Sequence, residues 1–163
     1  MAWSPLRGIE VRGAVPADAA DVARLLGQLG YPVSPQEATE RLAQVLRDDH
    51  GTLLVAADYG PLAGLIALHW APMLQDPRPV ARITTLVVDE AERGRGIGRL
   101  LLKAGAQAAR QAGCDLLELT TGTRREEAQA FYRAQGFVST SLRFSRSLRR
   151  NRPTGTPQGP GEE

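Results

Sequence analysis

The chain has 163 residues, of which 42% are hydrophobic and 23% are charged. These proportions are ordinary for one globular domain, and a chain of this length can bury a sizeable core without disulfides. The formal net charge is +2, aromatic residues make up 5%, and the single cysteine is Cys114. The composition therefore excludes an intramolecular disulfide and does not favour a groove in which nucleic-acid bases stack on aromatic rings.

The sequence also indicates a cellular compartment. No apolar run approaches the ~20 residues that a membrane span needs, and residues 1–12 lack the apolar core of a signal peptide. A single cysteine fits a reducing compartment, so we expect a cytoplasmic protein with no membrane partner. We expect no specific nucleic-acid partner either, although the arginines at 146, 149, 150 and 152 leave open unspecific, salt-dependent phosphate contacts.

The N-terminal third predicts a strand followed by two helices. Residues 9–14 are β-branched and apolar enough for a short strand. Asp18 is a plausible N-cap for a helix that ends at Gly30, because apolar residues follow at i, i+3, i+4 and i+7. The segment Ser34-Pro35-Gln36-Glu37 is a capping box with proline at the first helical position. It predicts a second helix that ends near residues 48–51.

The middle of the chain predicts a hairpin and then a central strand. Residues 52–57 and 62–69 are apolar runs separated by the turn Tyr59-Gly60-Pro61. Residues 70–79 contain three prolines and are expected to form a loop. Residues 80–88 are apolar on both faces, which is typical of a strand in the middle of a sheet. The carboxylates at 89, 90 and 92 are interpreted as a solvated loop.

The C-terminal half predicts a helix that ends at Gly113, a strand at 114–121 and a helix that ends at Gly136. Residues 137–148 alternate well enough for a final strand or hairpin. The predicted order is therefore β-α-α-β-β-β-α-β-α-β, in a mixed sheet with helices on both faces. Residues 149–163 are rich in Arg, Pro, Gly and Glu and cannot bury a core. We expect one domain, 1–148, and a disordered tail, 149–163.

The most informative segment is Arg93-Gly94-Arg95-Gly96-Ile97-Gly98-Arg99, which lies between the central strand and a helix. The first N–H groups of a helix lack intrahelical partners and lie at the positive end of the helix dipole, so they stabilise an anion. Glycine allows backbone to approach a ligand closely, and the three arginines add positive charge. The segment predicts a phosphate-binding turn; a tight turn without a ligand is the alternative.

The spacing of the glycines separates this turn from two common phosphate motifs. A dinucleotide fingerprint, G-x-G-x-x-G, would need glycine where Arg99 stands, and Arg99 also blocks a P-loop. What remains is R-x-x-G-x-G, formed by Arg93, Gly96 and Gly98 and preceded by Leu86-x-Val88. This pattern, with its flanking strand and helix, resembles the acetyl-coenzyme A signature of the Gcn5-related N-acetyltransferases (GNAT).

The resemblance implies the acyl-CoA N-acyltransferase (GNAT) fold, an α/β (α+β) class with a mixed, mostly antiparallel, splayed sheet. The strands at 80–88 and 114–121 would diverge, and the pantetheine arm would pair with the exposed strand edge. Acetyl-CoA would be the co-substrate, without a metal, because no cluster has metal-ligand spacing. The oxyanion-stabilising amide would be that of Val87 or Val88. The residues expected to bind the cofactor are Leu86, Val87, Val88, Arg93, Gly94, Arg95, Gly96, Ile97, Gly98 and Arg99.

Residues 123–137 resemble the closing motif of the same family, in which an alanine, an aromatic pair and Gly-Phe recur. The family tyrosine that commonly protonates the coenzyme A thiolate matches Tyr132. A phenol has a reference pKa of ~10 and a thiol ~8.5, so the phenol keeps its proton at neutral pH. A core tyrosine packed beside Phe131 is the alternative. The family often has asparagine where this chain has Arg125, which could reach a phosphate of the cofactor instead or be solvated.

The general base has no clear candidate. Many relatives place a carboxylate on the central strand, near the positions of Thr84 and Thr85 in this chain. Glu118 is a lone carboxylate in an apolar strand, and burial would suit it to this role because it raises a carboxyl pKa toward neutrality. Exposure to solvent or pairing with an arginine is the alternative for Glu118. His69 and a chain of waters are the other options.

These observations predict an N-acetyltransferase that moves the acetyl group of acetyl-CoA directly to a primary amine of a small molecule or protein. A non-catalytic acetyl-CoA-binding sensor of the same fold is the alternative, because the strand carboxylate is missing. Tyr31 and Pro32, between the first two helices, are candidate acceptor contacts. Relatives are often dimers, so a homodimer is one option, and the sequence leaves the oligomeric state open.

Overall fold

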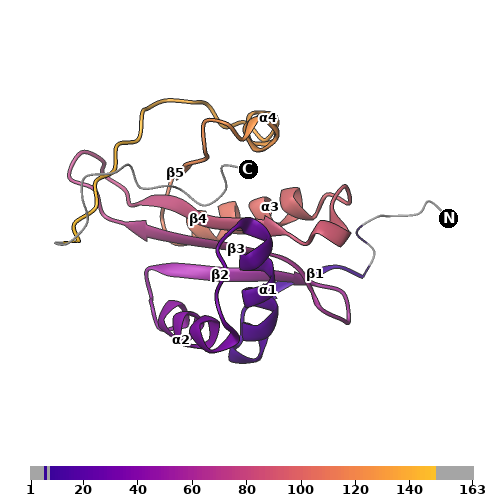
Figure 1. Ribbon diagram of the computed structural model, residues 1–163. Coiled ribbons are helices and arrows are strands. Elements are labelled where there is room, and N and C mark those ends of the chain that lie inside the picture. Colours follow the sequence, from indigo (N-terminus) through magenta and orange to yellow (C-terminus); the bar gives the residue numbers. More distant parts are fainter. Residues whose placement is uncertain (1–5, 7, 150–163) are drawn as a thin grey trace. The chain divides into compact units, whose positions relative to one another are not determined.

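The computed structural model describes residue 6 and residues 8–149, and the chain divides into two compact units, residues 1–119 and 120–163. The second unit contains one helix of the described chain, α4 (Glu126–Ala134) (Figure 1). The first unit contains, in chain order, β1 (Glu10–Gly13), the short η1 (Pro16–Asp18), α1 (Ala19–Leu29), α2 (Pro35–Leu46), β2 (Gly51–Ala57), β3 (Leu62–Ala71), β4 (Val80–Val88), the short η2 (Glu90–Glu92), α3 (Ile97–Gln111) and β5 (Leu116–Leu119).

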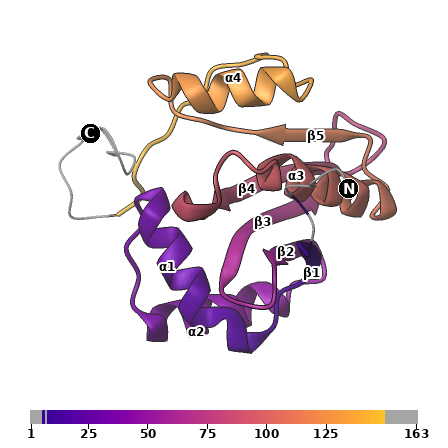
Figure 2. The same cartoon turned by 90° about the vertical axis from the view of Figure 1, so that its right-hand side faces the viewer.

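The sheet of the first unit has the order β1-β2-β3-β4-β5. The contacts from β1 to β4 are antiparallel, and β4 pairs with β5 in parallel. A parallel pair needs a long crossover between its strands, and α3 makes that crossover (Figure 2). The mixed, mostly antiparallel sheet predicted from the sequence is confirmed.

Helices cover both faces of this sheet. On one face, α1 and α2 contribute Leu25 and Leu42 to a core that includes Val55, Leu65 and Val87 of the strands. On the opposite face lies α3 (Figure 1), where Gly105 brings the helix backbone close to Ile66 and Leu68 of β3. The side chains of β4 meet helices on both faces, which explains why residues 80–88 are apolar on both sides.

Both helices begin at the predicted N-cap residues, Ser34 for α2 and Asp18 for α1, but only Ser34 caps its helix through a side-chain hydrogen bond. The amide of Glu37 donates to Ser34 Oγ at 3.1 Å and the amide of Ser34 donates to Glu37 Oε2 at 2.8 Å, so the capping box is confirmed. Asp18 does not cap α1 through its side chain. Its carboxylate accepts from the amide of Val15 at 2.9 Å and from both terminal nitrogens of Arg12, because a short 3₁₀ turn precedes the helix.

The C-terminal predictions differ from the structure. The strand expected at 137–148 is wrong, since described residues 137–149 form neither helix nor strand. Alternation specifies a strand where one face can be buried, yet Val138, Leu142 and Phe144 are all at least 80% exposed. The strand expected at 114–121 is present but shorter, as β5. The predicted tail falls almost entirely on residues 150–163, which lie outside the described residues. Among the described residues, no helix is both long enough and apolar enough to cross a membrane.

Gly64 fixes the distance between β3 and β4. A Cβ atom at Gly64 would lie 2.8 Å from the carbonyl oxygen of Val87 and 3.0 Å from Leu101 Cδ1. We expect Gly64→Ala to lower the free energy of unfolding by about 1–3 kcal/mol, because the strands must separate to admit the methyl group. The measurement is urea-induced unfolding.

The matched control is Gly27→Ala, in the exposed part of α1, where a Cβ would meet nothing within 4 Å. There we expect the free energy of unfolding to rise by up to ~1 kcal/mol, because alanine restricts the unfolded chain and favours the helix. A Gly64→Ala protein as stable as the unmutated chain would contradict the tight β3–β4 contact.

Candidate functional site

The pairing between β4 and β5 stops halfway along β4. β5 pairs with β4 from Val80 to Ile83, and no strand of the described chain pairs with residues 84–88 on that side. Thr84 lies at an irregularity in the β3–β4 register, where Ala67 pairs with Thr85 and Leu68 pairs with Ile83. Such a bulge bends a strand. The splay expected between these two strands is therefore present, and it leaves main-chain donors and acceptors of β4 on an open edge.

The hydrogen bonds of β4 show which amides face that edge. The amide of Asp89 donates to the carbonyl of Ala63 at 2.8 Å, so the main-chain groups of Asp89 face β3. Main-chain groups alternate in direction along a strand, so those of Val87 also face β3, in agreement with the position of its carbonyl beside Gly64. The main-chain groups of Leu86 and Val88 consequently face the open edge.

The glycine turn follows β4 and opens α3. Gly94 and Gly96 have φ angles of +80° and +84°, a region that L side chains rarely adopt. Gly96 is the N-cap of α3, and a Cβ at either glycine would meet nothing within 4 Å. Ile97, 1% exposed, anchors the first turn of the helix in the core. The N–H groups of this first turn have no partner within the helix, and the space at the Cβ positions of the two preceding glycines is open.

The three arginines of this turn differ in their surroundings. Arg93 and Arg99 are exposed and form no ion pair with any described residue. Arg95 is half-buried, and its guanidinium forms an ion pair with Glu92 in the same turn. Because a carboxylate already neutralises Arg95, the positive charge available to a ligand comes mainly from Arg93 and Arg99.

A hydrogen-bonded clamp from α1 holds the turn that precedes the glycines. The carboxylate of Asp89 forms an ion pair with Arg24 and accepts from Gln28 Nε2 at 3.4 Å. The amide of Ala91 donates to the same carboxylate at 3.0 Å, and the amide of Glu90 donates to Gln28 Oε1 at 3.0 Å. The Ala91 amide, followed by Arg24 and Gln28, lowers the pKa of Asp89 below its ordinary value.

The sequence did not anticipate this clamp. The sequence predicts a solvated loop at Asp89, and this prediction is wrong, since the Asp89 side chain is 15% exposed. The relevant signal was the i, i+4 spacing of Arg24 and Gln28 on the polar side of α1. The spacing shows that the two side chains share a face, but it does not show which loop they meet.

The second unit contains the predicted acid. Tyr132 lies in α4, half-buried, with its ring edge-on to Phe131 at 5.3 Å and to Phe137 at 5.6 Å between centroids. Burial raises the pKa of Tyr132 above its ordinary value, and the charge of Arg125 at the start of the helix lowers it in part. The phenol therefore keeps its proton throughout the neutral pH range.

The candidates for the base lie on the first unit and are accessible to solvent. Glu118 of β5 is exposed and forms no ion pair within the described ranges, so of the two interpretations of this carboxylate the structure agrees with exposure to solvent rather than burial. β5 is an edge strand in the first unit, which is why its polar side chain reaches solvent. His69 is also exposed, and it lines a pocket of about 310 Å³ together with Asp48 and Thr84.

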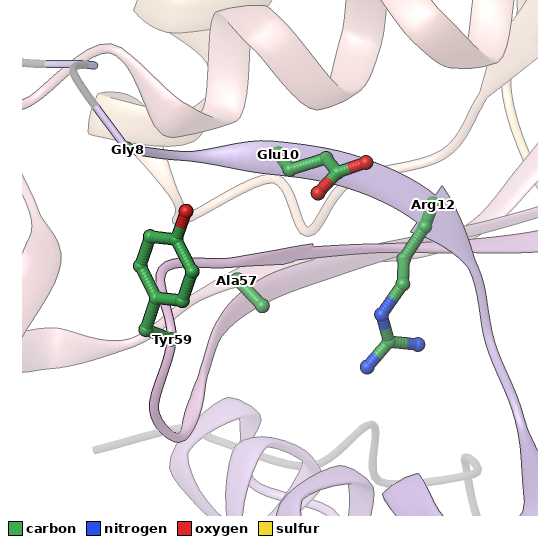
Figure 3. A pocket seen from close by; sticks show the side chains of 5 residues that line it. All are labelled: Gly8, Glu10, Arg12, Ala57 and Tyr59. Carbon is green, nitrogen blue, oxygen red and sulfur yellow. The ribbon is translucent and has the colours of Figure 1, made fainter.

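A second concavity lies at the opposite edge of the sheet. It has a volume of about 240 Å³ and is lined by Glu10 and Arg12 of β1 and by Tyr59, as Figure 3 shows. None of the residues expected to bind the cofactor lines it. In the part of the chain that the structure describes, no group of three His, Cys, Asp or Glu side chains could hold a metal ion.

Comparison with known proteins gives concordant matches. Residues 20–137 match the family model described as the acetyltransferase (GNAT) family. The aminoalkylphosphonate N-acetyltransferase of Salmonella typhimurium is 32% identical over 85% of this chain and 91% of that protein. The aminoglycoside N(6′)-acetyltransferase type 1 of Stenotrophomonas maltophilia is 35% identical over 80% and 86%. A solved putative acetyltransferase from Agrobacterium tumefaciens, 31% identical, superimposes with a TM-score of 0.77 over 83% of this chain and 97% of that one.

The clamp makes a prediction about stability and pH. We expect Arg24→Met to lower the free energy of unfolding by about 1–2 kcal/mol at pH 7, allowing for the partial exposure of Arg24 to solvent. The pKa of Asp89 is lowered in the folded state, so this contribution is fully present above the ordinary aspartate pKa of ~3.9 and is lost as the pH falls through the folded value. Urea unfolding at pH 7 and at progressively lower pH measures it.

The control for this experiment is Arg41→Met on the exposed surface of α2, which should change stability by less than ~0.5 kcal/mol. An Arg24→Met effect that stays constant down to the lowest pH would show that the ion pair with Asp89 is not its source.

Proposed function

Because the chain belongs to the acetyltransferase (GNAT) family, and is therefore an acetyl-CoA-dependent N-acetyltransferase, we propose that it transfers the acetyl group directly to a primary amine of a small molecule. The acceptor class is supported by two relatives, whose names give an aminoalkylphosphonate and an aminoglycoside as their substrates. The observation that carries the proposal is the open edge of β4 running directly into the glycine turn at the start of α3.

The glycine turn is proposed to bind the pyrophosphate of acetyl-CoA. The N–H groups of Ile97, Gly98 and Arg99 open α3, and a hydrogen bond to a charged acceptor contributes about 1.5–3 kcal/mol. Gly94 and Gly96 supply the left-handed backbone, and the exposed side chains of Arg93 and Arg99 supply charge. Arg95 keeps the turn in shape through Glu92. Arg125 of the second unit is a further phosphate contact in this proposal.

The open edge of β4 is proposed to bind the pantetheine arm and the thioester. Leu86 and Val88 direct their main-chain groups toward that edge, so pantetheine can pair with them as an added strand would. Of the two oxyanion donors expected from the sequence, we assign the role to the amide of Val88. The amide of Val87 faces β3, so Val87 acts by packing and by holding its neighbours in place.

The proposed reaction moves one proton onto sulfur and one away from nitrogen. The amine nitrogen attacks the thioester carbonyl carbon, and the tetrahedral intermediate collapses with cleavage of the carbon–sulfur bond. The phenol of Tyr132 donates its proton to the departing thiolate. For the base, we propose that Glu118, or His69 as the alternative, accepts the proton of the amine through water, because both side chains are exposed to solvent.

A non-catalytic acetyl-CoA sensor is the second candidate function. It is favoured by the absence of a carboxylate at the β4 bulge, where Thr84 and Thr85 stand. Calorimetric titration with acetyl-CoA, together with thiol-release assays over a panel of amines, tests both functions. Thiol release with any amine establishes the enzyme, binding without release across the panel favours the sensor, and absence of binding refutes both.

Two further proposals concern the setting of this activity. We propose that the protein works in the cytoplasm, which is supported by its single, buried cysteine, Cys114. We also propose a homodimer, which rests on the family alone. Neither assignment enters the reaction described above.

The role of Tyr132 makes a kinetic prediction. We expect Tyr132→Phe to lower kcat by roughly 10²–10⁴, the range for loss of a general acid, with little change in the affinity for acetyl-CoA. The ring contacts with Phe131 and Phe137 should survive, because phenylalanine keeps the aromatic ring. Steady-state thiol release measures kcat, and a loss smaller than tenfold would rule out the acid role.

The phosphate-binding role of the turn predicts a contrast between two glycines. Gly96 and Gly113 both have positive φ angles and open space at the Cβ position, so alanine strains either backbone by about 1–2 kcal/mol. We expect Gly96→Ala to weaken acetyl-CoA binding by about tenfold or more, because the N–H groups at the start of α3 lose their alignment. Gly113→Ala, at the other end of α3, should leave the Kd unchanged. Equal Kd values in calorimetry would contradict the assignment.

A further inference from the structure

The pocket beside His69 lies on the face of the sheet that α1 and α2 cover. Its volume of about 310 Å³ is large enough for a small metabolite. The end of α2 contributes Gln44 and Val45, the turn after it contributes Asp48, and the strands contribute Thr52, His69 and Thr84 among others. All of these residues belong to the first unit, so the pocket is formed by one compact part of the chain.

Arg82 lies on the same face as this pocket. His69 of β3 pairs with Arg82 of β4, and Arg82 pairs with Glu118 of β5. Directly paired residues on neighbouring strands project to the same side of a sheet. A polar row of one imidazole, one guanidinium and one carboxylate therefore crosses β3, β4 and β5.

Arg82 is half-buried in the middle of this row, yet it forms no ion pair with any described residue. Its neighbour Glu118 is exposed. A charge that is partly removed from water is ordinarily paired, because desolvation disfavours it otherwise. A guanidinium binds phosphonate, phosphate and carboxylate groups with two parallel hydrogen bonds. Arg82 therefore has the chemistry of a receptor for an anionic ligand.

The pocket also adjoins the start of the open β4 edge, where the thioester of acetyl-CoA is proposed to bind. Thr84, which lines the pocket, is the first residue of β4 beyond the last β5 pair at Ile83. The open edge of β4 begins at this residue and runs toward Val88. An acceptor held in the pocket would lie next to the start of the splay, with Arg82 two residues back along the same strand.

We propose that this pocket binds the acceptor, and that Arg82 binds an anionic phosphonate, phosphate or carboxylate group carried by the acceptor amine. The inference rests on the proposed function and adds a specificity-determining residue and a narrower substrate class to it. A small zwitterionic amine is the substrate, and an uncharged alkyl amine of the same length is a poor one. The anion is held by Arg82 while the amino group faces the thioester at the β4 edge.

The test uses three amines of matched length, namely 3-aminopropylphosphonate, 4-aminobutyrate and n-propylamine, with thiol release as the readout. The protein is compared with Arg82→Met, which keeps the aliphatic volume, with Arg82→Lys, and with Arg110→Met on α3 as the control. We expect Arg82→Met to raise the KM for 3-aminopropylphosphonate about 10–100-fold, as the loss of charge-assisted hydrogen bonds predicts. Arg82→Lys should restore part of this loss.

Several readouts separate this role from a structural one. The kcat/KM for n-propylamine, the KM for acetyl-CoA and the unfolding midpoint should stay unchanged in Arg82→Met, and every parameter should stay unchanged in Arg110→Met. A larger effect with the phosphonate than with 4-aminobutyrate identifies a phosphoryl-like anion as the preferred group. Equal losses for all three amines, or equal use of n-propylamine and 3-aminopropylphosphonate by the unmutated protein, would overturn the inference.

The experiment also distinguishes a failure of the proposed acetyl transfer from a failure of the proposed anion site at Arg82. If no amine releases thiol, transfer to these acceptors is refuted, and calorimetric titration of 3-aminopropylphosphonate into the protein saturated with coenzyme A decides the binding inference independently. Binding that disappears in Arg82→Met supports an anion site at Arg82. Absence of binding to the unmutated protein overturns it.

Discussion

The register between β4 and β5 is the constraint on which the rest of the site depends. β5 pairs with β4 from Val80 to Ile83 and then diverges, while β3 continues to pair with β4 as far as Val88. One side of β4 is therefore satisfied by the sheet and the other is left with unpaired main-chain groups. A ligand with amide groups of its own can pair with such an edge, and the pantetheine of acetyl-CoA is such a ligand.

The start of α3 must stay aligned with this edge, and α1 contributes to that alignment. Asp89 follows directly after β4 and is held by Arg24 and Gln28, while the buried Ile97 anchors the helix that comes next, α3. The exposed glycine turn is thus fixed at both ends by groups that are removed from solvent. The left-handed backbone at Gly94 and Gly96 is therefore open to a ligand and still held in one position. Main-chain N–H donors that are preorganised in this way bind a ligand without the entropic cost of being ordered first.

The proposed binding sites for the cofactor and the acceptor lie on different faces of the sheet. α3 covers one face and provides the helix start for the cofactor, whereas the face of α1 and α2 carries the pocket lined by Asp48, His69 and Thr84. β4 is common to both sites, and its bulge at Thr84 lies where they approach each other. A cofactor and an acceptor can therefore bind the same strand without competing for the same groups.

Local signals in the sequence are sufficient to predict the elements of the first unit and the glycine turn. Hydrophobic periodicity, the capping box at Ser34 and the breaks at Gly30 and Gly113 are local signals, and residues 80–88 were bounded as the structure has them. The tertiary structure decided what depends on partners distant in the chain. It showed that Glu118 is exposed, that residues 137–148 form no strand, and that Asp89 meets α1. A sequence pattern cannot show these points, because burial, strand pairing and ion pairs each depend on two segments of the chain, while a pattern describes one segment.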